Sequence, residues 1–360
     1  MPDRYYLIAL TSVPGIGPIR TRRLLSAFGS AEAAWRAPLA ALCAAGLDER
    51  LAAALVALRR TLDPELLPAR LERARTRALV PADAEYPARL AELPYAPPVL
   101  FVRGRLTVAD ERAVAVVGTR RATNYGREVT RRLTADLVAA GVTIVSGLAR
   151  GIDAVAHQTA LAARGRTLAV LGCGTDVVYP PEHRHLAEQI VEQGALISEY
   201  PPGTAPDGPN FPARNRFIAA LALGVLVVEA PARSGALLTA NFAADQGRQV
   251  FAVPGSILGG SAEGCHALIR EGATLVTSAA ELLADLNLAQ QELRAEARRL
   301  PLGDDETENA LLRLLSAEPT HADELSRASG LPISTVNATL TIMELKGLVR
   351  QAAPMSYTLA

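Results

Sequence analysis

Residues 146–161 read SGLARGIDAVAHQTAL and bring together residue types that can do chemistry. Asp153 and His157 stand four positions apart in a helix-like run, so their side chains can touch. They do not form a catalytic set by themselves, because the chain has no second histidine at metal-ligand spacing with them and no Gly-x-Ser-x-Gly turn. We expect Asp153 to cap free amides at the helix start and His157 to hydrogen-bond beside it, with catalysis as the alternative.

Four segments share one character: small residues, hydroxyls or arginines directly after a strand-like run. They are VVGTRRATNYG at 116–126, VSGLARG at 145–151, FPARNRF at 211–217 and VEAPARSGALLTA at 228–240. Amides at helix N-termini favour anions, and glycine lets a phosphate approach closely. Arginine offers phosphate a fork of donors, so Arg120, Arg150, Arg214 and Arg216 predict a site for several phosphates in a row.

Phe211 precedes two of these arginines, Arg214 and Arg216. An exposed aromatic ring beside arginines is typical of proteins that hold a single nucleic-acid strand by stacking its bases. The alternative is that Phe211 fills the core and that one arginine pairs with Glu199 or Glu229.

Known nucleotide-binding loops fit poorly. GTRRATNYG does not match Gly-x-Gly-x-x-Gly, and LGCGTDVVYP at 171–180 has a lone Gly-x-Gly that is followed by two prolines. A Walker loop needs a lysine, and Lys346 is the only lysine in the chain. ATP and NAD binding are therefore disfavoured, and we expect no cofactor.

The elements that must position these loops alternate regularly from 112 to 285. The strand-like runs are AVAVVG, VTIVSG, TLAVLG, ALISEY, VLVVEA, VFAVPG and TLVTS, with helix-like runs between them. Apolar strands that are each followed by a helix indicate an α/β fold with a Rossmann-like, mostly parallel, doubly wound sheet. Ligands bind such sheets at the carboxyl ends of the strands, where the four loops would meet.

The N-terminal segment, 1–75, reads as an all-helical domain. A Gly-x-Gly turn at Gly15 and Gly17 lies between two amphipathic stretches and resembles a helix-hairpin-helix, with Arg20, Arg22 and Arg23 directly after it. Such a turn can face a DNA phosphate, or it can simply pack two helices together. Both interpretations remain open.

The C-terminal segment reads as three helices and a hairpin, which is the winged-helix pattern. Its third predicted helix, 332–346, has no arginine for a DNA groove, so we favour protein contact or autoregulation over DNA reading. We expect four segments: a helical domain at 1–75, the Rossmann-like domain at 76–287, a linker at 288–305 and a winged helix at 306–360.

Bulk composition sets further limits. The chain has 360 residues, of which 49% are hydrophobic, and 37 acidic residues cancel 37 basic ones. Its three cysteines are too far apart to predict a metal site or a disulfide framework. With no apolar run of membrane-spanning length and no signal-peptide pattern at MPDRYYLIAL, we expect a cytoplasmic protein without a membrane span.

The central motifs together resemble the DprA/Smf family, the DNA-processing proteins of natural transformation. The resemblance covers roughly 80–285. In family order its motifs are GTRRATNYG, SGLARGIDAVAHQTAL, VLGCGTDVVYP, SEYPPGTAPDGPNFPARNRFIAAL, VVEAPARSGALLTANFAADQGRQVFAVPG and EGCHALIREGA. The flanking segments also fit the family, which has an N-terminal domain related to sterile-alpha-motif or helix-hairpin-helix folds and a C-terminal winged helix.

This resemblance implies a binding protein and not an enzyme. Family members bind single-stranded DNA cooperatively, form homodimers through the Rossmann-like domain, and load the RecA recombinase on incoming strands that carry single-strand-binding protein. Carried over by motif, the DNA-binding set is Thr119, Arg120, Ser146, Gly147, Arg150, Phe211, Arg214, Asn215, Arg216, Ser234, Gly235 and Thr239. Thr119 and Thr123 stand where the family usually has serine, and no lysine stands where several members place one near the strand.

Two other classes of function remain as alternatives. A nucleotide phosphoribohydrolase of the lysine-decarboxylase-like group has a similar Rossmann domain, with a Pro-Gly-Gly-x-Gly-Thr-x-x-Glu loop. The matching region here, APARSGALLTA, has no glutamate after it. The third class is a protein-interaction scaffold, which would bind neither nucleotides nor DNA.

Overall fold

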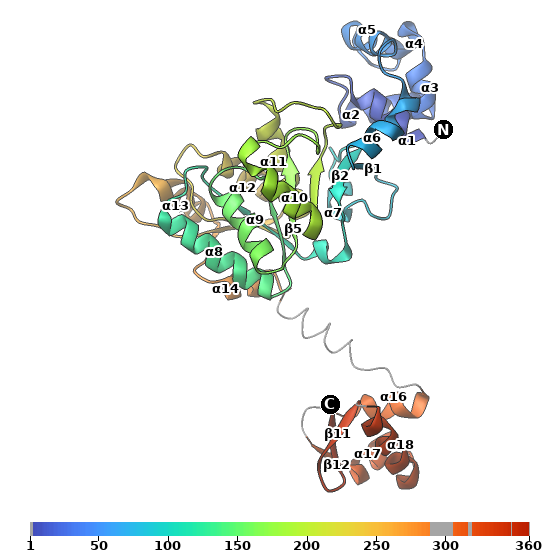
Figure 1. Ribbon diagram of the computed structural model, residues 1–360, viewed down its shortest axis with the longest axis vertical. Helices are drawn as coiled ribbons and strands as arrows, with labels where there is room; N and C mark the ends of the chain where they lie inside the picture. The colour runs from blue at the N-terminus through green and yellow to red at the C-terminus, as the bar shows by residue number, and fades with distance from the viewer. Residues whose placement is uncertain (1–2, 289–304, 316–318, 347, 360) are drawn as a thin grey trace. The chain divides into compact units, whose positions relative to one another are not determined.

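The computed structural model describes residues 3–288, 305–315, 319–346 and 348–359. The chain divides into two compact units, Met1–Leu286 and Asn287–Ala360 (Figure 1). Most of the predicted linker, 288–305, lies outside the described residues. No helix among the described residues is both long and apolar enough to cross a bilayer.

The first unit begins with six helices. They are α1 (Asp3–Thr11), α2 (Pro18–Phe28), α3 (Ala31–Arg36), α4 (Leu39–Ala44), α5 (Glu49–Leu58) and α6 (Leu67–Arg73). The predicted helical hairpin is present as α1 and α2, and the turn between them needs Gly15, whose φ is +95°. Arg20 does not point away from this turn, because its guanidinium donates back to the Gly15 carbonyl oxygen at 2.8 Å.

These helices share a core with the first two strands of the sheet. Leu24, Trp35 and Leu55 are buried in one cluster with Val99 and Phe101. Removing this apolar surface from water ties the helical segment to the sheet, so the two predicted N-terminal domains lie within one compact unit.

A nine-stranded sheet forms the centre of the first unit. Its strands are β1 (Arg77–Leu79), β2 (Leu100–Gly104), β3 (Ala113–Val117), β4 (Thr143–Ser146), β5 (Thr167–Leu171), β6 (Ala195–Ser198), β7 (Gly224–Val227), β8 (Gln249–Ala252) and β9 (Thr274–Leu275). Their order is β1-β2-β6-β5-β4-β3-β7-β8-β9. β1 and β2 are antiparallel to their neighbours, and all pairs from β6 to β9 are parallel.

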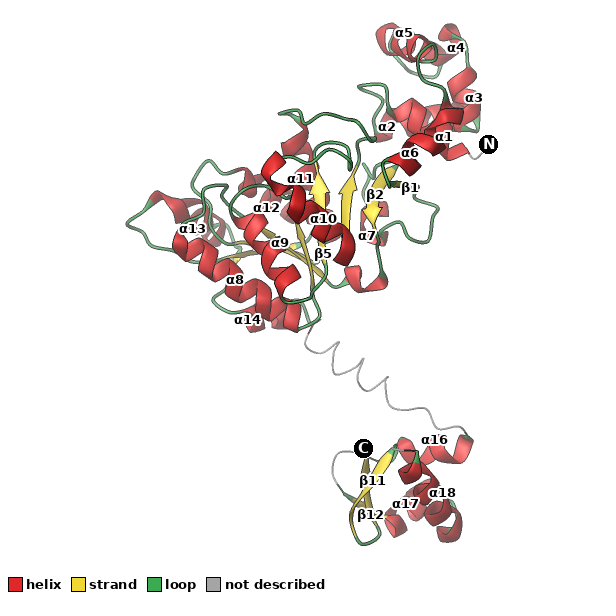
Figure 2. Cartoon of the chain, viewed as in Figure 1, coloured by secondary structure: helices red, strands yellow, loops and turns green. Residues whose placement is uncertain are grey.

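Helices cover both faces of this sheet (Figure 2). They are α7 (Ala88–Ala91), α8 (Asn124–Ala139), α9 (Ile152–Ala162), α10 (Arg184–Gln193), α11 (Asn210–Leu221), α12 (Gly235–Asp245), α13 (Glu263–Arg270) and α14 (Ala279–Asp285). β5 shows the two faces: Leu168 and Val170 pack with α11, while Ala169 and Leu171 pack with α9 and α10. This alternation with burial on both sides confirms the predicted doubly wound α/β fold.

The strand order also fixes where loops meet. The chain runs from β3 outward through β4, β5 and β6, and then returns to the other side of β3 as β7. The loops after β3 and β7 therefore diverge from neighbouring strands, which opens a crevice at the carboxyl edge.

The second unit has the predicted winged-helix elements. They are α16 (Glu306–Leu312), β10 (Thr320–His321), α17 (Ala322–Ser329), α18 (Ile333–Leu345), β11 (Val349–Ala353) and β12 (Ser356–Leu359). Leu311, Leu325, Leu340 and Tyr357 belong to one buried cluster, which gives this unit a core of its own.

Candidate nucleic-acid interface

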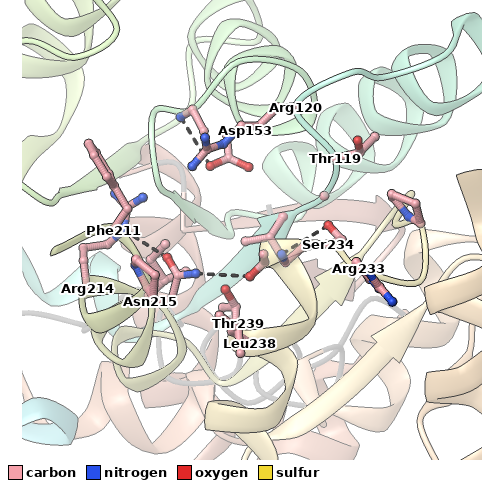
Figure 3. A pocket seen from close by; sticks show the side chains of 18 of the residues that line it. Thr119, Arg120, Asp153, Phe211, Arg214, Asn215, Arg233, Ser234, Leu238 and Thr239 are labelled. Atoms are coloured by element: carbon pink, nitrogen blue, oxygen red, sulfur yellow. Dashed lines mark hydrogen bonds between the residues drawn. The ribbon is translucent and has the colours of Figure 1, made fainter. Parts of the chain in front are cut away.

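A cavity of about 430 Å³ lies at the carboxyl edge of the sheet, in the crevice between the loops after β3 and β7. Figure 3 shows side chains from the first, third and fourth predicted loops, together with Asp153 from α9, around this cavity. Eight residues of the predicted set line it: Thr119, Arg120, Phe211, Arg214, Asn215, Ser234, Gly235 and Thr239.

The first loop is held rigidly from both sides. The Thr119 amide donates to the Glu229 carbonyl oxygen at 2.7 Å, and the Ile152 amide donates to the Thr119 carbonyl oxygen at 3.2 Å. Gly151 permits this closeness: its φ is +78°, and a Cβ there would lie 2.2 Å from the Thr119 carbonyl oxygen. Arg120 is thereby presented, exposed, at the cavity mouth.

The structure adds two arginines that the predicted DNA-binding set did not include. Arg121 and Arg233 line the cavity beside Arg120. All three are exposed, and within the described ranges none of their guanidinium groups has a hydrogen bond or an ion pair. Both lie inside the predicted phosphate loops, so their positions in the sequence could have indicated that they belong to the site.

The second loop corrects the expectation that Ser146 faces a phosphate. Ser146 is fully buried, and its hydroxyl donates to the Val116 carbonyl oxygen at 2.7 Å, so this side chain links two strands and does not face the cavity. Asp153 and His157 do not pair with each other. Asp153 accepts from the Gly147 amide at 3.1 Å and the Ala149 amide at 3.4 Å, which confirms a capping role, but for loop amides.

His157 bonds instead to Thr167 on β5, with 2.7 Å between its Nδ1 and the threonine Oγ1. The Thr167 hydroxyl donates its one hydrogen to the Ile144 carbonyl oxygen, so His157 must be the donor to Thr167. Burial lowers the pKa of His157 to about 3, with the charges of His183 and Arg214 acting in the same direction. A neutral, fully enclosed imidazole is a structural group.

Arg214 is the buried cation of the site. It is only 5% exposed, and its guanidinium donates to the carbonyl oxygens of Gly147, at 2.9 Å, and Val170. Burial lowers its pKa to about 10, and the charge of Asp153 opposes that shift. Arg214 therefore stays charged at neutral pH and places a positive charge in the cavity wall.

The other side chains of the predicted set on α11 point in two directions. Phe211 and Asn215 face the cavity, and the Asn215 amide donates to the Gly235 carbonyl oxygen at 3.2 Å. Arg216 does not line this cavity. It pairs with Glu199 at 2.8 Å and lies against the rings of Tyr95 and Phe217. The structure therefore shows the predicted alternative for Arg216, an ion pair with Glu199.

The fourth loop leads into α12, and the start of this helix faces the cavity. Ser234 caps it by accepting from the Ala236 amide at 3.3 Å. Gly235 is exposed, and a Cβ there would meet nothing within 4 Å, so its lack of a side chain keeps the helix start open. The cavity therefore combines four arginines with one buried carboxylate and a helix N-terminus, an arrangement that suits a polyanion.

Comparison with known proteins identifies the family. The model of the DNA recombination-mediator protein A family matches residues 77–287, and a DprA winged-helix model matches residues 295–353. The chain belongs to this family. The predicted resemblance to DprA/Smf proteins is thus confirmed.

Individual relatives extend over most of the chain. Protein Smf of Synechocystis is 37% identical over 99% of this chain and 98% of its own length. DNA processing protein DprA of Streptococcus pneumoniae is 47% identical over 56% of this chain and 71% of its own.

Two solved structures also match. The X-ray structure of DprA from S. pneumoniae has a TM-score of 0.67 at 37% identity, covering 78% of this chain and 97% of that one. A structure of DNA processing protein A from Helicobacter pylori, described for its single-stranded DNA binding mode, has a TM-score of 0.54 at 27% identity, covering 61% and 97%.

Proposed function

We propose that this protein binds single-stranded DNA in the cavity at the carboxyl edge of the sheet and delivers it to a RecA-type recombinase. The observation that carries the proposal is the cavity itself, which joins the exposed Arg120, Arg121 and Arg233 to the buried Arg214 and to the partly exposed ring of Phe211. The single-strand binding named for the H. pylori relative supports the same ligand.

The geometry suggests how a strand would be held. The exposed arginines and the exposed start of α12 at Gly235 would donate hydrogen bonds to successive phosphates, and Arg214 would add positive charge from the cavity wall. Phosphate contacts do not depend on base identity, so binding would be independent of sequence. Phe211 would supply a face for one base, because stacking tolerates any base.

The proposal is for a binding protein without catalysis. Cys173, which follows β5, is buried, and burial raises the pKa of its thiol to about 11. His157 is enclosed and Asp153 is occupied by loop amides. Protection of incoming strands, exchange with single-strand-binding protein, a homodimer and a cytoplasmic location belong to the same proposal.

Fluorescence anisotropy with labelled oligothymidine tests the binding step. Arg120→Ala combined with Arg233→Ala removes two exposed guanidiniums, and Arg60→Ala, on another exposed arginine, is the control. We expect the double variant to bind every sequence more weakly. Its slope of log affinity against log salt should fall by about 1.4, that is, roughly 0.7 per lost phosphate contact. Unchanged binding by the double variant contradicts the site.

A separate assay tests delivery. RecA filament growth on strands coated with single-strand-binding protein should accelerate when this protein is added, and the double variant should not accelerate it. If the protein binds DNA normally but does not accelerate filament growth, it binds single strands and has no loading role.

A further inference from the structure

Two aromatic rings meet at the rim of the cavity. Tyr179, in the loop after β5, and Phe211, in the first turn of α11, have ring centroids 5.2 Å apart with an interplanar angle of 38°. Phe211 rests on Gly172, where a Cβ would lie 3.1 Å from the ring. Phe211 lines the cavity, and Tyr179 lies just outside it, still 40% exposed. Together the rings form a path that leads out of the cavity.

A cation lies beside the outer ring. Arg150 is brought to this part of the rim by its ion pair with Glu182, three positions after Tyr179 in the chain. Arg150 is exposed, and its Nε is 2.5 Å from an oxygen of Glu182, which is exposed as well. His183 fixes this acidic turn against the second loop through the Leu148 carbonyl oxygen at 2.9 Å. Glu182 thus occupies the guanidinium of Arg150, the one arginine of the second loop.

We propose that Tyr179 and Phe211 form a two-ring step on which consecutive bases of the strand stack as it leaves the cavity, and that the phosphate beyond the outer base displaces Glu182 from Arg150. This inference rests on the proposed function. The order along the path is cation, ring, ring, cation: Arg120, Phe211, Tyr179, Arg150. A stacked pair of bases would therefore have one phosphate-binding arginine on either side.

The exposure of Tyr179 argues for base stacking over a role in packing alone. A tyrosine that served only to cover Phe211 would bury its own ring, since apolar surface gains free energy by leaving water. Tyr179 keeps much of its surface in solvent, and among the described residues its hydroxyl has no hydrogen-bond partner. Its ring is therefore available to a base.

Glu182 has a regulatory consequence. It resembles a phosphate in charge and in hydrogen-bond acceptors, so it competes with DNA for Arg150. The hydrogen bond from Arg150 lowers the pKa of Glu182, which keeps this competitor ionised. When a strand binds, its phosphate replaces the Glu182 carboxylate on Arg150. The strand should therefore bind more weakly at the two-ring step than in the cavity, where the exposed arginines have no competing acid among the described residues.

The stacking step is tested with two probes of equal length, an oligothymidine and an oligomer of abasic deoxyribose phosphates. We expect wild-type protein to prefer oligothymidine, and Tyr179→Leu to lose roughly tenfold of that preference, the size of one stacking contact. Tyr179→Phe should keep the preference, and Arg120→Ala should weaken both probes alike. A Tyr179→Leu protein with the wild-type preference overturns the step.

The competition is tested with Glu182→Gln, which keeps the shape and removes the charge. Affinity for both probes should rise roughly twofold to fivefold, the value of an exposed ion pair. In an Arg150→Ala background the same substitution should change nothing. A Glu182→Gln protein with wild-type or weaker affinity overturns the displacement.

These results are distinguishable from failure of the proposed function. If wild-type protein binds neither probe, the proposed function fails. If wild type binds both and Tyr179→Leu and Glu182→Gln behave like wild type, the proposed function stands and this inference fails.

Discussion

The guanidinium of Arg214 donates a hydrogen bond to the carbonyl oxygen of Gly147, 2.9 Å away, and so joins α11 to the loop after β4. A Cβ on Gly147 would lie 2.6 Å from that guanidinium and 2.8 Å from the Asp153 carboxylate. One arginine therefore connects two of the predicted loops, and glycine is what leaves room for it.

Arg214→Leu should lower the free energy of unfolding by at least about 3 kcal/mol. The substitution leaves the carbonyl oxygens of Gly147 and Val170 without their donor and the Asp153 carboxylate without its opposing charge. Arg120→Leu, on the exposed side of the cavity, should stay within about 0.5 kcal/mol of wild type. Urea unfolding measures both, and equal stability of the two variants would contradict the buried role.

Two glycines of the site should affect different properties, Gly151 the stability of the fold and Gly235 the binding of DNA. Gly151→Ala places a Cβ 2.2 Å from a carbonyl oxygen at a φ of +78°, so this variant should be strongly destabilised. Gly235→Ala meets nothing within 4 Å and should fold normally, but its methyl group occupies the start of α12 where a phosphate would approach. Thermal unfolding and oligothymidine binding, measured together, check this. A Gly235→Ala protein that binds like wild type speaks against that phosphate position.

Arg216 should matter for stability and not for DNA binding. Burial raises the pKa of Glu199, and Arg216→Met would leave that carboxylate without its ion-pair partner, at a cost of about 3–5 kcal/mol. Adding Glu199→Gln should recover part of the loss. The coupling free energy of this double-mutant cycle is the measurement. Oligothymidine affinity of the folded double variant should equal that of wild type, and a large drop would return Arg216 to the DNA site.

Acid sensitivity should depend on His157. Its pKa is about 3 in the folded protein and close to 6.5 in the unfolded chain, so the unfolded state takes up a proton first. The stabilising contribution is complete above pH 6.5 and is lost as the pH falls toward 3, by up to about 1.4 kcal/mol per pH unit. His157→Gln should flatten this limb of the stability profile. His185→Gln, at an exposed position of α10, should leave it unchanged, and identical slopes in both variants would contradict the assignment.

The sequence determined the fold to a large extent. Runs such as AVAVV and TLAVL have no polar face, so they must lie in a sheet that is covered on both sides, and helix-like runs follow each one. Because parallel strands place their carboxyl ends at one edge, the same pattern predicted that the four loops would gather there. Turn residues and helix starts are local, which is why Gly15 and the capping role of Asp153 could be read from the chain itself.

Only the tertiary structure decided which side chains face the cavity. Arg214 and Arg216 are two positions apart on α11, so they leave the helix in different directions, and packing against Tyr95 and Glu199 sends Arg216 away from the site. Ser146 faces β3 and not a ligand, because its strand is enclosed on both faces. Tyr179 reaches Phe211 from 32 positions away in the sequence through the order of β5 and β6 in the sheet. Direction on a helix and contact between distant segments depend on packing of the whole core, which residue types and spacing along the chain do not specify.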